Sequence, residues 1–146
     1  MFNPSLREVR QFFFTTFRNG EASQSLTDLE KIAYSIILEH PEYRYVLQNP
    51  ERYLDFLWPA EAGETNPFLH LSMHLSLLEQ LSIDQPPGIK ELYVTLCTKF
   101  KDEHETLHQM MDCLAEMIWQ AQYSNNQPDP QIYLQCLTSK INSGKI

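Results

Sequence analysis

The sequence predicts an all-α protein, an irregular helical bundle of about five or six helices in a single domain. Only 4 of the 146 residues are glycine, and apolar residues recur at intervals of three and four along most of the chain, which is the period of an amphipathic helix. A chain of this length is typical of one domain. Three patterns of Ser, Thr or Asp followed three residues later by Glu mark helix starts, at Ser5, Thr27 and Asp102.

The first half of the chain alternates between clear helical patterns and proline-interrupted segments. Gly20 is expected to close the first helix, and the second should stop at His40 because Pro41 disfavours helical geometry in the residue before it. Asn49 followed by Pro50 predicts a new helical start. The expected elements are a helix over 5–20, a helix over 27–40, one or two short helical turns over 41–58 and a loop over 59–65.

The second half contains the longer amphipathic patterns. Asn66 followed by Pro67 repeats the start signal. Residues 89–123 are either one helix or two, and the Asp102 capping pattern favours a break there. The helices expected in this half cover residues 67–82, 89–101, 103–123 and 130–141.

The composition argues against some classes of function. The net charge is −8, with 11 Lys and Arg against 19 Asp and Glu, and a nucleic-acid-binding protein needs clustered basic residues to bind phosphates. No apolar run approaches the roughly 20 residues of a membrane span, so no membrane partner is expected. The three cysteines, Cys97, Cys113 and Cys136, form no CxxC motif and cannot all pair, which favours a reducing compartment and a cytoplasmic location.

Four of the five histidines fall into two H-x-x-x-H pairs, His70/His74 and His104/His108. Residues four apart project from one helix face, about 5–6 Å apart at Cβ, so each pair can hold one metal ion through two nitrogens. Both pairs share their helix face with apolar residues, which predicts that they face inward. With residues 89–123 as one helix or as two, both pairs come to a similar height in the bundle, and a four-histidine site is permitted.

Carboxylates accompany the second pair. Asp112 follows His108 by one helical turn, and Glu105 and Glu116 line the adjacent stripe. Residues 102–139 contain six acidic residues and no Lys or Arg, which suits a bound cation. Histidine and carboxylate donors on facing helices are how bundles bind metals such as Zn, Ni, Mn or Fe. The predicted ligands are His70, His74, His104, His108, Asp112, Glu105 and Glu116.

His40 is not assigned as a ligand, because a contact with backbone carbonyls at a helix end explains it. No motif for nucleotide, acyl-transfer or zinc-protease chemistry is present. If the protein is an enzyme, metal-activated water or small-ligand chemistry is the expectation. The alternative is a non-enzymatic interaction or structural module, as a homodimer, whose buried histidine network only specifies core packing.

Three blocks of sequence, residues 1–14, 63–89 and 103–120, carry a family resemblance. The most specific is Gly-Glu-Thr-Asn-Pro-Phe-Leu-His-Leu-Ser-Met-His-Leu over residues 63–75. Together they resemble a bacterial family known as domain of unknown function 1841, over residues 1–122, with a divergent tail over 123–146. The resemblance implies a small cytoplasmic bacterial protein and supplies no catalytic residues.

Overall fold

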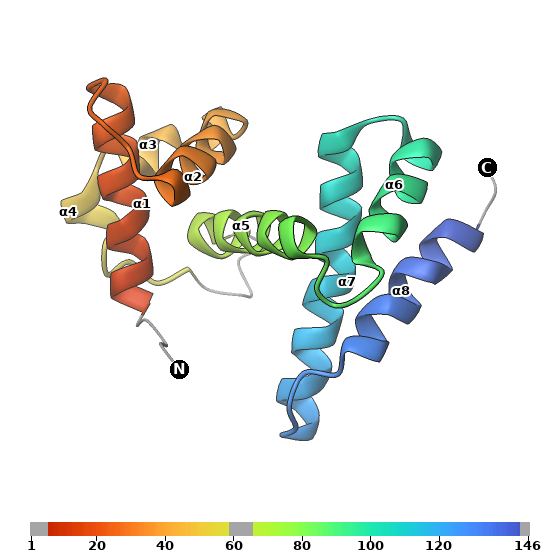
Figure 1. Ribbon diagram of the computed structural model, residues 1–146. Coiled ribbons are helices and arrows are strands. Elements are labelled where there is room, and N and C mark those ends of the chain that lie inside the picture. The colour runs from red at the N-terminus through yellow and green to blue at the C-terminus, as the bar shows by residue number, and fades with distance from the viewer. Residues whose placement is uncertain (1–5, 59–65, 144–146) are drawn as a thin grey trace. The chain divides into compact units, whose positions relative to one another are not determined.

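The computed structural model describes residues 6–58 and 66–143, and within these ranges every regular element is helical. The all-α prediction is confirmed (Figure 1). The described helices number eight rather than five or six, because two turns of four residues within 41–58 are separate short helices. The elements are α1 (Leu6–Glu21), α2 (Asp28–Leu38), the 3-10 turn η1 (Pro41–Tyr43), α3 (Arg44–Leu47), α4 (Pro50–Tyr53), α5 (Pro67–Ile83), α6 (Ile89–Phe100), α7 (Glu103–Ser124) and α8 (Pro130–Asn142).

The chain divides into two compact units, residues 1–75 and 76–146, with the boundary inside α5. Each unit has its own buried apolar residues. The single domain predicted for residues 1–146 therefore stays a prediction. In neither described range is there a helix with the length and apolar character needed to cross a membrane.

Local side-chain hydrogen bonds cap the starts of α2, α5, α7 and α8. The backbone N–H of Glu30 donates to Thr27 Oγ1 at 3.1 Å, and the Glu30 carboxylate accepts from the Thr27 N–H at 2.9 Å, which completes the predicted capping box. Asp102 caps α7 by accepting from the His104 N–H at 2.9 Å. Lys101 adopts a left-handed conformation with φ 60°, so residues 89–123 form two helices, not one.

Two local predictions differ from the structure, one in where a helix ends and the other in how a helix is capped. Gly20 does not close α1, which continues to Glu21; a Cβ at Gly20 would collide with the Tyr34 ring, so glycine permits close approach of that side chain. The helical start predicted at Asn49 and Pro50 is present as α4, but the Asn49 side chain does not cap it and instead donates to the Tyr45 carbonyl at 2.7 Å. Ser5 of the first capping pattern and the expected loop at 59–65 lie outside the described residues.

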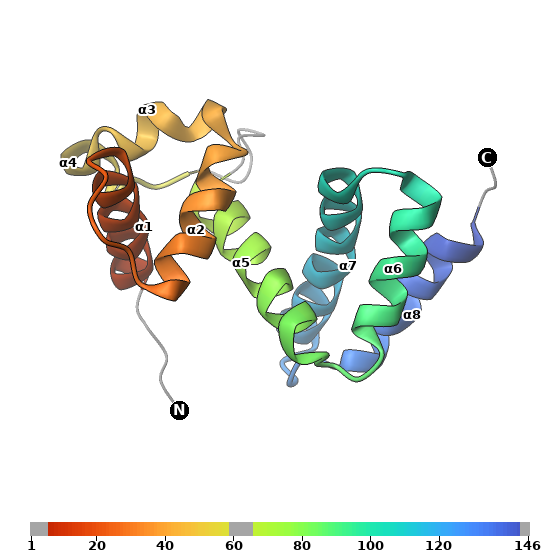
Figure 2. The same cartoon turned by 45° about the horizontal axis from the view of Figure 1, so that its top comes forward.

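In the first unit, α1 packs beside α2 and α3 around buried aromatic and aliphatic side chains (Figure 2). Arg10 is buried at 7% exposure among them. Its Nη1 donates to the carbonyls of Leu54 and Phe56 at 3.1 and 2.8 Å, and its guanidinium lies 5.2 Å from the Phe68 ring centroid. These carbonyls follow the short helix α4, so Arg10 supplies hydrogen bonds that the chain would otherwise lack there.

In the second unit, α6, α7 and α8 pack against one another (Figures 1 and 2). A disulfide joins Cys113 of α7 to Cys136 of α8, and Cys97 is a free thiol. Lys99 of α6 donates to the carbonyls of Lys140 and Ser143, which caps the C-terminus of α8. Cysteine usage in the sequence predicted a reducing compartment, whereas a disulfide is a bond typical of oxidising compartments.

Replacing Arg10 with Met should lower the free energy of unfolding by about 2–4 kcal/mol, because it leaves partly buried carbonyls without their charged donor. The measurement is urea unfolding followed by circular dichroism. Arg7→Met is the matched control on the same helix, since Arg7 pairs with Asp55 at the surface, with side chains 65% and 72% exposed. The control should change stability by less than about 1 kcal/mol; equal losses for the two variants would contradict the assigned role of Arg10.

Candidate metal centre

Three histidines of the first unit converge. His40 follows the end of α2, and His70 and His74 occupy successive turns of α5. The ring centroid of His40 lies 4.9 Å from that of His70 and 4.7 Å from that of His74. The centroids of His70 and His74 are 4.9 Å apart. One ring nitrogen of each histidine lies within 4.8 Å of the others. The arrangement therefore offers three nitrogen donors around one point.

The hydrogen bond made by His40 Nδ1 determines the tautomer of the His40 ring. His40 Nδ1 lies 2.8 Å from the Ile36 carbonyl oxygen, and because a carbonyl only accepts, Nδ1 carries the proton. In the neutral ring Nε2 then carries a lone pair, which is directed at His70 Nε2 at 3.2 Å. A metal-ligating histidine commonly donates its second ring N–H to a carbonyl in this way, which orients the ring and fixes the tautomer.

The separation of the two Nε2 atoms is compatible with a shared ion. Two nitrogens bound to zinc at about 2.0–2.1 Å in a tetrahedron lie about 3.3 Å apart, close to the observed 3.2 Å. The same distance is also that of an N–H···N hydrogen bond between the rings when His70 Nε2 carries a proton. The geometry thus serves both a metal centre and a direct histidine contact.

The cluster is largely withdrawn from solvent. His40 is 2% exposed and His74 is 1% exposed, while His70 is half-buried. The Tyr43 ring stacks on His40, with centroids 5.5 Å apart and planes 3° from parallel, and meets His70 edge-on. Burial, with a smaller effect of the Glu42 charge, raises the pKa of Tyr43 to about 12. The phenol therefore stays neutral at physiological pH and covers the imidazoles as an apolar ring.

The second predicted pair is also formed. His104 and His108 lie on α7 with ring centroids 4.1 Å apart, and both are half-buried. Their i,i+4 spacing places them on one face of α7, as expected. Their participation in the same site as His70 and His74 remains a prediction from the sequence.

The three predicted carboxylates all lie at the surface of α7. Glu105 accepts a hydrogen bond from Gln109 at 2.7 Å, and Glu116 accepts one from Gln120 at 2.7 Å. Lys140 of α8 approaches Asp112, with Nζ 3.7 Å from Oδ2. The predicted absence of an opposing cation near Asp112 is therefore wrong, because Lys140, just beyond residue 139, reaches Asp112 across the α7–α8 contact.

His40 is the site residue that sequence reasoning missed. Its predicted contact with a helix-end carbonyl is present, but the ring's other nitrogen joins the cluster. It lies 30 residues from His70 in the sequence, so no local spacing connects the two. The only local indication in the sequence was that His40 directly precedes Pro41, which interrupts the helical pattern of α2.

The chain belongs to the family described as Domain of unknown function (DUF1841), whose sequence pattern matches residues 5–139. The match extends past residue 122, where the resemblance was expected to end, and so includes most of α8. Residues 1–4 lie before the match. Comparison with curated proteins and with solved structures finds no match.

The raised pKa of Tyr43 gives a direct test of its surroundings. An unfolded phenol loses its proton near pH 10, whereas folded Tyr43 keeps it to about pH 12; the stability that Tyr43 contributes is therefore lost between these values as pH rises. Spectrophotometric titration of wild type and Tyr43→Phe should give a difference curve centred near 12. A difference curve centred near 10 would contradict the burial of this phenol over the histidines.

Proposed function

We propose that this chain binds a divalent transition-metal ion through His40, His70 and His74. The observation that carries the proposal is the convergence of three imidazoles whose ring nitrogens lie within 4.8 Å of one another. The Nδ1 contact of His40 with the Ile36 carbonyl supports it, because this contact leaves Nε2 as the donor atom. His40 and His74 are buried at 2% and 1% exposure, so their ring nitrogens are withdrawn from competing water.

The donor set favours some metals over others. Imidazole suits Zn, Ni and Fe, while Mn prefers carboxylate, carbonyl and water oxygens. The carboxylates predicted as ligands are exposed and hydrogen-bonded to neighbouring residues of α7 or near Lys140. We therefore rank Zn and Ni first, Fe next and Mn last among the four metals considered.

The fourth coordination position decides between a structural and a catalytic role. A further histidine, for which His108 and His104 remain the predicted sources, would complete a closed structural site. A water molecule in that position would instead give three protein ligands and an activated water, which is the arrangement of hydrolytic zinc sites. An enzymatic activity belongs to the second case only.

A structural role for the histidines is the second candidate function, and the 3.2 Å contact between His40 and His70 favours it. Buried polar groups need hydrogen-bond partners, and these rings provide partners for one another. In that case the chain is a non-enzymatic interaction module, and a homodimer is its proposed assembly. Metal-dependent stabilisation separates the two candidates.

Untagged protein purified without chelator should contain close to one equivalent of metal per chain by elemental analysis. Added Zn²⁺ or Ni²⁺ at 100 times Kd should stabilise the metal-free protein by about 2.7 kcal/mol, which corresponds to a rise in Tm of roughly 8 °C. His40→Gln, His70→Gln and His74→Gln should each abolish most of this rise. Tyr43→Phe, which leaves all imidazoles in place, is the matched control and should retain it.

The same titration on His104→Gln and His108→Gln tests the second pair. Loss of the metal response in either variant assigns that histidine as a ligand, and a full response removes it from the proposed set. Metal well below one equivalent, together with a Tm that Zn²⁺, Ni²⁺, Fe²⁺ and Mn²⁺ leave unchanged, would overturn the metal proposal and leave the structural role.

A further inference from the structure

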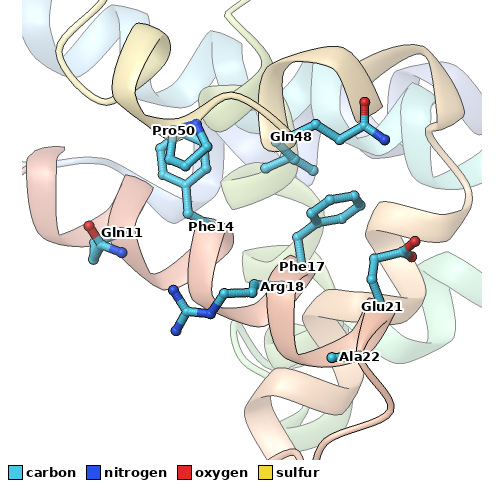
Figure 3. Close-up of a pocket in the computed structure, with 9 residues that line it drawn as sticks. Gln11, Phe14, Phe17, Arg18, Glu21, Ala22, Gln48 and Pro50 are labelled. Atoms are coloured by element: carbon cyan, nitrogen blue, oxygen red, sulfur yellow. The ribbon is translucent and has the colours of Figure 1, made fainter.

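A second feature of the first unit lies on α1. A cavity of about 490 Å³ is bordered by α1, α3 and the start of α4 (Figure 3). Its volume falls within the range of about 300–1,000 Å³ that is typical of small-molecule sites. None of its lining residues belongs to the histidine cluster, so an inference drawn from it is independent of the proposed metal centre.

The floor of the cavity is apolar and aromatic. Phe14 and Phe17 of α1 and Leu47 of α3 line it, with 3%, 6% and 3% exposure. The rings of Phe14 and Phe17 point toward the chain segment that carries Gln48 and Pro50 (Figure 3). The Phe14 ring packs edge-to-face against Phe68, with ring centroids 5.3 Å apart. These contacts give a preformed surface on which an apolar ligand body can pack.

The two charged residues of the cavity differ in whether they are free to pair with a ligand. Glu21 is already engaged, since it accepts from Arg44 at 2.8 Å and from Tyr34 at 2.7 Å; the hydrogen bond with Arg44 lowers the pKa of Glu21 and keeps it ionised. Arg18 is exposed, and among the described residues no carboxylate pairs with it. Arg18 and Glu21 are the two charged residues that line the cavity, and because Arg44 already pairs with Glu21, Arg18 is the charge available to a ligand.

The geometry points to a small amphipathic carboxylate, with an aromatic or aliphatic body, as the ligand of this cavity. We propose that its body packs on Phe14, Phe17 and Leu47 while its carboxylate pairs with Arg18. The planar guanidinium matches a carboxylate through two parallel hydrogen bonds. A phosphate, with a charge nearer two, would need more cationic donors than the one that is available here.

The test uses the full chain and two carboxylates, 3-phenylpropionate and octanoate, followed by isothermal titration and by the methyl NMR signals of Leu47. We expect saturable binding of at least one of them with shifts at Leu47. The neutral analogue 3-phenylpropanamide should bind about tenfold more weakly, because it lacks the charge that Arg18 recognises. Arg18→Gln should weaken carboxylate binding by a similar factor and leave amide binding unchanged.

Arg7→Gln is the matched control, since Arg7 is an exposed arginine of the same helix outside the cavity, and it should bind as wild type does. The proposal is overturned if neither carboxylate shifts the Leu47 signals at about 10 mM, a concentration that corresponds to only weak binding. It is equally overturned if the amide binds as tightly as the carboxylate, or if Arg18→Gln and Arg7→Gln behave alike.

Discussion

The hydrogen bond from His40 Nδ1 to the Ile36 carbonyl is the contact on which the histidine cluster depends. Pro41 ends α2, and the last carbonyls of a helix have no partner within it. The Ile36 carbonyl accepts from the Glu39 backbone N–H at 3.1 Å, and the His40 ring is its second donor. This contact fixes the tautomer and turns Nε2 toward His70. Without it the ring could rotate, and the three imidazoles would not present their nitrogens to one point.

Arg10 follows the same physical rule in the same unit. Residues 41–53 form short helical pieces, and short helices leave many carbonyls without a partner inside the helix. His40 serves the end of α2, and Arg10 serves the end of α4. Both are buried side chains whose nitrogens donate to backbone oxygens. Part of the polar interior of this unit is therefore a consequence of its irregular backbone. The proposed metal site uses His40 Nε2, the ring nitrogen that does not contact the Ile36 carbonyl.

Local features of the sequence predicted the fold well, while contacts between distant residues set the limits of prediction. Thr27, Asn66 and Asp102 cap helices because each bonds to backbone only two or three residues away. The His70/His74 pair is likewise a consequence of helical spacing. Gly20 was misjudged because its reason is the Tyr34 ring, fourteen positions along the chain. The Cys113–Cys136 bond and the approach of Lys140 to Asp112 both depend on how α7 meets α8, which no short motif encodes.

The central claim is that three imidazoles share one metal ion, and X-ray absorption at the zinc edge of the zinc-loaded chain tests it most directly. We predict imidazole scattering from at least three histidines with Zn–N distances of about 2.0–2.1 Å, and the loss of one imidazole in His40→Gln. A spectrum with oxygen neighbours only, or one that His40→Gln leaves unchanged, would contradict the account.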